Sequence, residues 1–280
     1  MLLVGPLAGL LLLTPPARFR EWAWLIATSA WTLLWLNQAG GLAAQFARAG
    51  AVLLIGTFLA LTVWRPSARF SRALAATALA GGALTLWMWR LHIEWGAVRR
   101  AIEDELWTYN QQLLLRLGKI GGTETAGQML LDQMSATVRN IAAFYPALFF
   151  LAGLAGLLLA WSWYHRIVSR PVGPPPASFA SFRFSDQLIW GWVLGVGLCV
   201  LRLPPIWGVL GSNLLLVWSV LYAARGLAVL SVGSKRLPRP IMATIGIVAM
   251  VLLPFVVGGL TLLGFADTWL DFRRRLASAT

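Results

Sequence analysis

The sequence predicts an all-helical protein that crosses a membrane about seven or eight times. Of its 280 residues, 59% are hydrophobic and only 12% are charged, which is about half the charged fraction of an ordinary soluble domain. Apolar runs near 18 residues or longer recur along the chain, a length that matches the roughly 30 Å hydrocarbon layer of a bilayer. Because the runs are continuously apolar rather than alternating, they favour spanning helices over the strands of a barrel.

Eight candidate helices follow from the apolar runs and the breaks between them. They cover residues 1–14, 22–38, 50–64, 73–90, 144–165, 187–203, 207–231 and 240–265. The first and third are short for complete crossings, so seven crossings with one re-entrant or surface segment is the alternative. The first run also lacks the basic start and cleavage site of a signal peptide, so we expect a retained span. Residues 1–280 are expected to form a single integral membrane domain.

Basic residues gather in every second loop. They follow the first, third, fifth and seventh runs, as Arg18 and Arg20, then Arg65, Arg69 and Arg72, then Arg166, Arg170 and Arg183, then Lys235, Arg236 and Arg239. The positive-inside rule makes these loops cytoplasmic, including the proline-rich segment 166–186, and places the N-terminus outside. One feature disagrees, because eight crossings put the basic "FRRR" of residues 272–275 outside. The net charge of +13 forms no continuous basic stripe, so we expect no nucleic-acid partner.

Residues 91–143 form the sizeable polar segment of the chain, and its pattern predicts two amphipathic helices joined by "GKIGG". Their apolar faces carry Ile102, Leu106, Tyr109, Leu113 and Leu117 in the first helix and Leu130, Met134, Val138 and Ile141 in the second. The segment falls on the external side in the orientation above. The two helices are expected either to rest at the membrane interface or to cap a cavity between spans.

The sequence carries no motif that indicates an enzyme. It has no "GxxxxGK[ST]" phosphate loop, no "HExxH" and no "CxxC". His92 and His165 fall on different predicted sides of the membrane, and the single cysteine, Cys199, lies inside an apolar run. We therefore expect no catalytic residues, no metal site and no cofactor.

The candidate ligand-binding residues are polar or aromatic side chains within the apolar runs. Many tryptophans stand at run ends, as in an interfacial aromatic belt, but a few positions lie deeper. The candidates are Trp31, Trp35, Asn213, Trp218 and Arg225.

Arg225 has two alternative environments. It either extends to the cytoplasmic headgroups or faces the bundle interior, paired with carbonyls, an acidic side chain or an anionic ligand. Asp267 and Asp271 are candidate partners, but eight crossings put them on the opposite face, so pairing would require the last run to turn back.

Three stretches, "FYPALFFLAGLAGLLLAWSWYHRIVSR", "LYAARGLAVLSV" and "LGFADTWLDFRRR", together resemble the YybS-like family of bacterial membrane proteins. Ala224–Arg225 departs from that family, which has a polar neutral residue before "GLAV", so no family-wide role is carried over to Arg225. The family is similar to the substrate-binding S-components of energy-coupling-factor transporters. The resemblance implies a multi-pass protein of the bacterial cytoplasmic membrane with an S-component-like core.

Two functions remain open. The resemblance implies a solute-binding or transport subunit, with a small-molecule ligand and with separate scaffold and ATPase subunits as partners besides the lipid bilayer. The alternative is a non-catalytic membrane scaffold or assembly factor that acts through helix packing and basic cytoplasmic loops. A cavity lined by Trp31, Trp35, Asn213 and Trp218 would favour the first, whereas a solid apolar interior with an exposed groove would favour the second.

Overall fold

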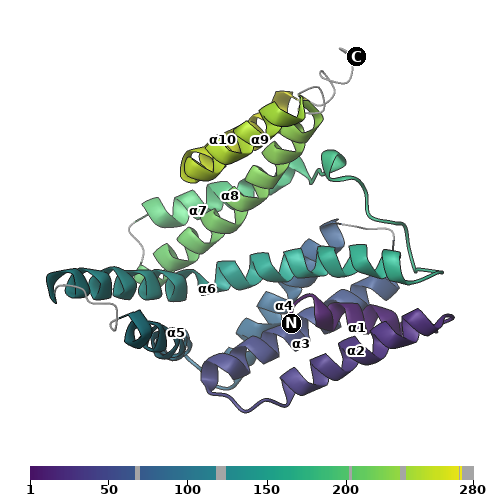
Figure 1. Ribbon diagram of the computed structural model, residues 1–280, viewed down its shortest axis with the longest axis horizontal. Coiled ribbons are helices and arrows are strands. Elements are labelled where there is room, and N and C mark those ends of the chain that lie inside the picture. Colours follow the sequence, from purple (N-terminus) through teal and green to yellow (C-terminus); the bar gives the residue numbers. More distant parts are fainter. Residues whose placement is uncertain (67–69, 118–123, 202–203, 234–237, 271, 273–280) are drawn as a thin grey trace. The chain divides into compact units, whose positions relative to one another are not determined.

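The computed structural model describes residues 1–66, 70–117, 124–201, 204–233, 238–270 and 272. All regular structure in these residues is helical, which confirms the predicted all-helical class. Contacts divide the chain into two compact units, Met1–Pro176 and Ala177–Thr280 (Figure 1). The boundary between the units lies in the proline-rich segment that was predicted to be a loop.

Helices of spanning length occur in both units. In the described residues, four segments are apolar and long enough to cross a membrane: Leu42–Trp64, Leu131–Ile167, Ile206–Gly233 and Leu253–Leu270. The membrane-protein class therefore agrees with the sequence, while seven or eight crossings stay a prediction.

Six α-helices are described in the first unit, within residues 1–66, 70–117 and 124–176 (Figure 1). They are α1 (Val4–Leu12), α2 (Phe19–Leu36), α3 (Leu42–Trp64), α4 (Phe70–Arg90), α5 (Trp95–Leu117) and α6 (Glu124–Ile167). The short α1 packs against α2, α3 and α6, and its residues from Gly5 to Leu11 are all buried. A helix of nine residues is only about 14 Å long. The first apolar run is therefore an interior helix of the unit.

α6 joins two segments that the sequence pattern treats separately. The amphipathic stretch near Leu130 and the apolar run 144–165 form one helix of 44 residues, with Pro146 inside it. Proline removes one backbone hydrogen bond, but the helix continues through it because neighbouring turns remain intact. Val138 and Ala142 from its first half are buried.

α5 and the first half of α6 pack against the beginning of α3, at one end of the unit. Val98 and Ile102 on α5 pack with Phe46, Leu84 and Ala142. The amphipathic prediction for α5 holds at Ile102 but not at Tyr109, which is 81% exposed. The side chains of Leu113, Leu117 and Leu130, and the "GKIGG" residues 118–122, lie outside the described part of the chain.

In the described residues of the second unit there are two short 3-10 turns and four α-helices. They are η2 (Phe179–Ser181), η3 (Asp186–Leu188), α7 (Ile189–Val200), α8 (Pro205–Gly233), α9 (Arg239–Val251) and α10 (Leu253–Leu270). The predicted run 240–265 is thus two helices, separated by Leu252 alone. Pro254, in the first turn of α10, supplies no backbone N–H, so it favours a helix start at this point.

α8 and α10 run parallel to each other. Thr261 Oγ1 donates to the Ser219 carbonyl oxygen at 3.2 Å, and Arg225 Nε donates to Asp267 Oδ2 at 3.0 Å. Both pairs are 42 residues apart (261 − 219 and 267 − 225), so the two helices advance in the same direction. The chain between them, which includes α9, therefore turns back along α8 before α10 begins.

Candidate functional site

Arg225 forms the most buried charged site of the second unit. Its side chain is 0% exposed. Nε donates to Asp267 Oδ2 at 3.0 Å, Nη2 to the Asp267 carbonyl oxygen at 3.3 Å, and Nη1 to Asp186 Oδ1 at 2.9 Å. Of the two environments expected from the sequence, the interior one is therefore observed, and Arg225 does not extend to the headgroups.

Asp267 reaches Arg225 because the last apolar run turns back. An arrangement of eight alternating crossings puts these two residues on opposite faces, and the parallel course of α8 and α10 overturns that placement. Asp267 itself is 1% exposed. The other candidate partner, Asp271, lies outside the described residues.

Two glycines allow α8 and α10 to approach closely beside this pair. A Cβ placed on Gly226 would collide with the Leu260 carbonyl oxygen, and one placed on Gly264 would collide with the Tyr222 carbonyl oxygen. The backbones are therefore in contact, as in small-residue packing between membrane helices. This approach brings the guanidinium and the carboxylate on the same two helices within hydrogen-bond distance.

Asp186 connects the buried pair with the surface. Its side chain is 46% exposed and lies 3.7 Å from Arg183, which is 51% exposed. The Phe184 ring, on the same segment, lies 5.4 Å from the Arg225 guanidinium carbon. Two cationic and two anionic side chains thus form a chain from the surface to the interior, and their formal charges cancel. Such an arrangement is suited to holding helices in register, since each of these charges meets an opposite one.

The remaining candidate residues are divided between the two units, and each is described within its own unit. In the first unit, Trp31 is 58% exposed and Trp35 is partly buried. In the second unit, Asn213 Nδ2 donates to the Val209 carbonyl oxygen of its own helix at 2.9 Å. Trp218 packs against α7, where a Cβ on Gly191 would collide with its indole.

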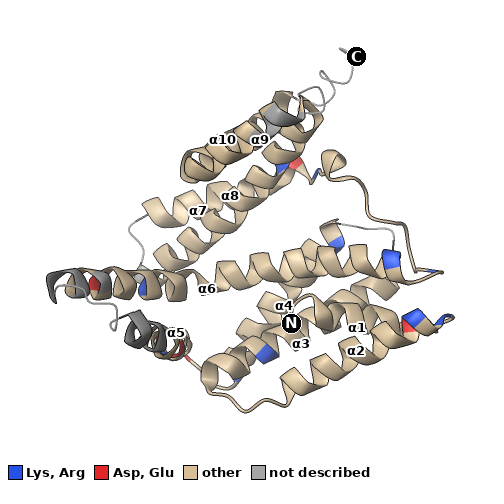
Figure 2. Ribbon diagram, viewed as in Figure 1, with Lys and Arg blue, Asp and Glu red and all other residues tan. Residues whose placement is uncertain are grey.

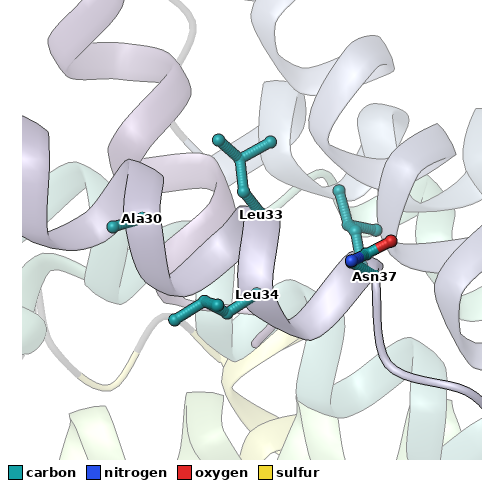
Figure 3. A pocket seen from close by; sticks show the side chains of 5 residues that line it. Ala30, Leu33, Leu34 and Asn37 are labelled. Atoms are coloured by element: carbon teal, nitrogen blue, oxygen red, sulfur yellow. The ribbon is translucent and has the colours of Figure 1, made fainter.

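A hollow on α2 is lined by other residues. Figure 3 shows its lining, which consists of Ala30, Leu33, Leu34, Leu36 and Asn37. Leu33 and Leu34 are 66% and 67% exposed, so the hollow is a shallow apolar groove on the surface of the first unit. None of the five candidate ligand-binding residues lines it.

Glu21 forms a buried polar site in the first unit that sequence reasoning missed. It is 2% exposed, and its carboxylate accepts from Ala17 N at 2.6 Å, Ser169 N at 2.9 Å and Ser169 Oγ at 2.8 Å. The hydrogen bond from the Ala17 backbone, followed by those from Ser169, lowers the pKa of Glu21 to about 2. The available signal was its position three residues after the N-cap Arg18, where glutamate often accepts backbone N–H groups.

Arg72 is, besides Arg225, the other buried cation among the described residues, and it lies at the same end of the first unit as Glu21. It is 4% exposed. Its guanidinium carbon lies 4.0 Å from the Trp161 ring centroid and 5.2 Å from that of Phe58, and Nη1 donates to the Pro66 carbonyl oxygen at 3.1 Å. The aromatic faces and the carbonyl stabilise the charge where no acidic side chain is paired with it in the described residues.

The two histidines lie at different ends of the first unit, and the cysteine belongs to the second unit. His165 Nδ1 lies 3.0 Å from the Trp161 carbonyl oxygen and Nε2 lies 3.3 Å from that of Gly173, whereas His92 follows the far end of α4. Cys199 is exposed near the end of α7. In the part of the chain that the structure describes, no three His, Cys, Asp or Glu side chains come together as a metal site would require.

Comparison with protein families finds one match that covers nearly the whole chain. The family model described as "Predicted membrane protein (DUF2232)" matches residues 2–268. No curated protein and no solved structure matches the chain.

Proposed function

The chain belongs to the family described as predicted membrane protein (DUF2232), and from this premise we propose that it is a non-catalytic membrane scaffold or assembly factor. In this proposal it has no enzymatic activity, and it binds partner proteins in the membrane through the surfaces of its helices and its basic loops. Partner proteins, rather than a solute, are its ligands.

The observation that carries this proposal is that the buried charged side chains bind groups of their own unit. Arg225 is paired with Asp267 and Asp186, and Glu21 accepts from Ala17 and Ser169. A solute site in a membrane bundle would leave convergent polar groups facing a cavity. Here these polar groups bind other parts of the same unit, and the groove on α2 is shallow and apolar.

The competing function is the solute-binding or transport subunit implied by the resemblance to S-components. It requires a ligand held between spans and separate ATPase subunits in the same complex. The two proposals therefore differ in what should be recovered with the intact protein.

Affinity purification from native membranes in mild detergent tests the proposal, with mass spectrometry of both proteins and retained small molecules. We expect stoichiometric membrane proteins and lipids, without a stoichiometric metabolite. Stoichiometric recovery of ATPase subunits together with a specific metabolite would reject the scaffold and support transport.

A photo-crosslinking amino acid on α2 locates the partner surface. We expect crosslinks to another protein from Leu33, which is 66% exposed, and none from Leu25, which is 9% exposed on the same helix and serves as the matched control. Crosslinks to lipid alone from a series of exposed positions on α2, α3, α8 and α10 would contradict a scaffold function.

A further inference from the structure

One end of the first unit gathers arginines from three separate parts of the chain. The connection from α1 to α2, the connection from α3 to α4, and the segment after α6 all lie at this end. Arg20 Nη2 donates to the Arg166 carbonyl oxygen at 2.5 Å. Figure 2 shows basic residues at the neighbouring ends of α2, α4 and α6. We define the basic end as the exposed arginines Arg18, Arg20, Arg65, Arg166 and Arg170.

Buried contacts hold these loops together. Glu21 links the turn at Ala17 to the turn at Ser169 through the three hydrogen bonds described above. Gly173 has a positive φ of 78°, and a Cβ there would lie 2.8 Å from the Pro66 carbonyl oxygen. Ala17 is therefore linked to Ser169, and Pro66 lies close to Gly173, so the described residues of the three connections are held near one another.

The basic end has no counter-charge from its own part of the chain. Glu21 is the only acidic residue in sequence segments 13–24, 60–75 and 160–176, and it is buried and bonded to backbone N–H groups and a hydroxyl. Among the described ion pairs, none involves an arginine of the basic end. Among the residues that the structure describes, no acidic side chain is paired with these arginines, which leaves their charge available to an anion from outside the protein.

Exposed aromatic side chains at the same end indicate the depth of these charges. Phe19 is 88%, Trp22 50% and Trp64 71% exposed, and the Arg65 guanidinium carbon lies 4.9 Å from the Trp64 ring centroid. Aromatic residues of membrane proteins concentrate at the headgroup level. The arginines beside them are then at the level of the lipid phosphates.

We propose that the basic end is a binding surface for the phosphate groups of anionic lipids. Guanidinium groups bind phosphate through paired N–H donors. Here Arg18, Arg65 and Arg170 lie outside the helices, while Arg20 lies in the first turn of α2 and Arg166 in the last turn of α6. Glu21 is a positioning residue for this surface, since it holds two of the three connections together without contacting the lipid. The lipid class is set by charge, so a zwitterionic lipid lacks the net charge that the surface requires.

Native mass spectrometry of the purified full chain, titrated with phosphatidylglycerol, tests this surface. The triple variant Arg18→Gln/Arg65→Gln/Arg170→Gln removes three of its charges. Its matched control, Arg90→Gln/Arg100→Gln/Arg139→Gln, removes three exposed arginines outside the basic end. Each basic residue near an anionic surface contributes roughly a fivefold change in binding. We expect the apparent dissociation constant for the lipid to rise at least about fivefold in the first variant and to stay unchanged in the control.

Three outcomes would overturn the proposal. They are an equal loss in both triple variants, equal binding of phosphatidylcholine and phosphatidylglycerol by the unaltered protein, and displacement of the lipid by inorganic phosphate at the same concentration. The last outcome would indicate a site for a free anion. If the triple variant does not fold, the single variants Arg18→Gln and Arg170→Gln take its place, and unchanged lipid binding in both would reject the surface.

Discussion

Arg225 is a permanently charged residue inside an apolar helix. Its neighbours supply the hydrogen-bond acceptors and the negative charge that would stabilise it in place of water. Three of its N–H groups bind Asp267 and Asp186. A charge taken out of water costs several kcal/mol unless it is paired with good geometry. The pair therefore specifies how α8 and α10 align, because a shift of either helix by one turn would separate the charges.

Replacing Arg225 by leucine should strongly destabilise the second unit. The variant leaves the buried Asp267 carboxylate without its cation, and breaking a buried pair in this way costs about 3–5 kcal/mol. Thermal unfolding in detergent measures the loss. The double variant Arg225→Leu/Asp267→Leu should recover most of it, because it removes both charges.

Arg183 provides the control for this substitution. It is also an arginine near Asp186, but it is half exposed at 3.7 Å, and exposed pairs contribute only about 0–1 kcal/mol. Arg183→Leu should therefore leave the unfolding temperature nearly unchanged. Equal, small effects of Arg183→Leu and Arg225→Leu would show that the buried pair contributes little to the stability of the unit.

Glu21 should make the stability of the first unit depend on pH. Its pKa falls from 4.5 to about 2 in the folded protein, so the folded state favours the carboxylate. The stabilisation is fully present above pH 4.5 and is lost as the pH falls toward 2.

The measurement compares the unaltered protein with Glu21→Gln in detergent from pH 7 to pH 3. We expect the unaltered protein to be the more stable at pH 7, and the difference to shrink steadily below pH 4.5. A difference that stays constant across this range would mean that Glu21 does not titrate as described.

At the scale of the helices, Gly226 and Gly264 determine how closely α8 and α10 pack. An added methyl group at either position meets backbone oxygen rather than a side chain that could move aside. The helices would have to separate, which would also lengthen the bond between Arg225 and Asp267. Close packing and charge pairing are thus one interaction between the same two helices.

Gly226→Ala and Gly264→Ala should each destabilise the second unit, by roughly 1–3 kcal/mol. Gly259→Ala is the matched control on α10, because a Cβ there meets nothing within 4 Å. That control should be neutral or stabilising by up to about 1 kcal/mol, since alanine is the better helix former. Thermal unfolding of the three variants provides the test, and equal losses in all of them would contradict the close approach.

The apolar pattern predicts most of the helices but not their junctions. The run 22–38 corresponds to α2 and 207–231 to α8 within a few residues. α3 begins at Leu42 rather than near residue 50, because Arg48 is inside the helix, where it donates to the Ala44 and Leu36 carbonyl oxygens. The hydropathy pattern does not predict the helix break at Leu252, because apolar residues continue on both sides of it.

The candidate site could be predicted only in part. An arginine in an apolar run stands out in the sequence, and Asp267 is a reasonable partner by charge. Their pairing depends on the direction of α10, which the apolar pattern does not encode. The role of Asp186 was missed for a related reason, because it lies in a 3-10 turn whose position depends on how α7 packs against α8.

At the scale of the whole molecule, the parallel course of α8 and α10 predicts the side of the C-terminus. Two parallel spanning helices end on the same side of the membrane, so we expect the chain between them, which includes α9, to return to the side where α8 begins. The positive-inside rule then places the basic residues that follow α8 and those that follow α10 in the sequence on the same, cytoplasmic side. The conflict created by eight alternating crossings, which put "FRRR" outside, is thereby removed.

The variants Pro238→Cys and Thr280→Cys, each made in a Cys199→Ser background, test on which side of the membrane these two positions lie. We expect neither cysteine to react with a membrane-impermeant maleimide in intact cells, and both to react once the membrane is permeabilised. A C-terminal cysteine that reacts in intact cells while that at 238 does not would restore the alternating arrangement.

The burial of α1 has a consequence for the synthesis of the protein. Its nine residues span about 14 Å, which is too short for the roughly 30 Å hydrocarbon layer. Gly156 on α6, which meets the Leu2 carbonyl oxygen, is translated 154 residues later (156 − 2). At about 5–20 residues per second, that contact forms roughly 8–30 s after α1 leaves the ribosome. During this interval α1 can pack only against α2 and α3, so its contacts with α6 are the last part of its packing to form.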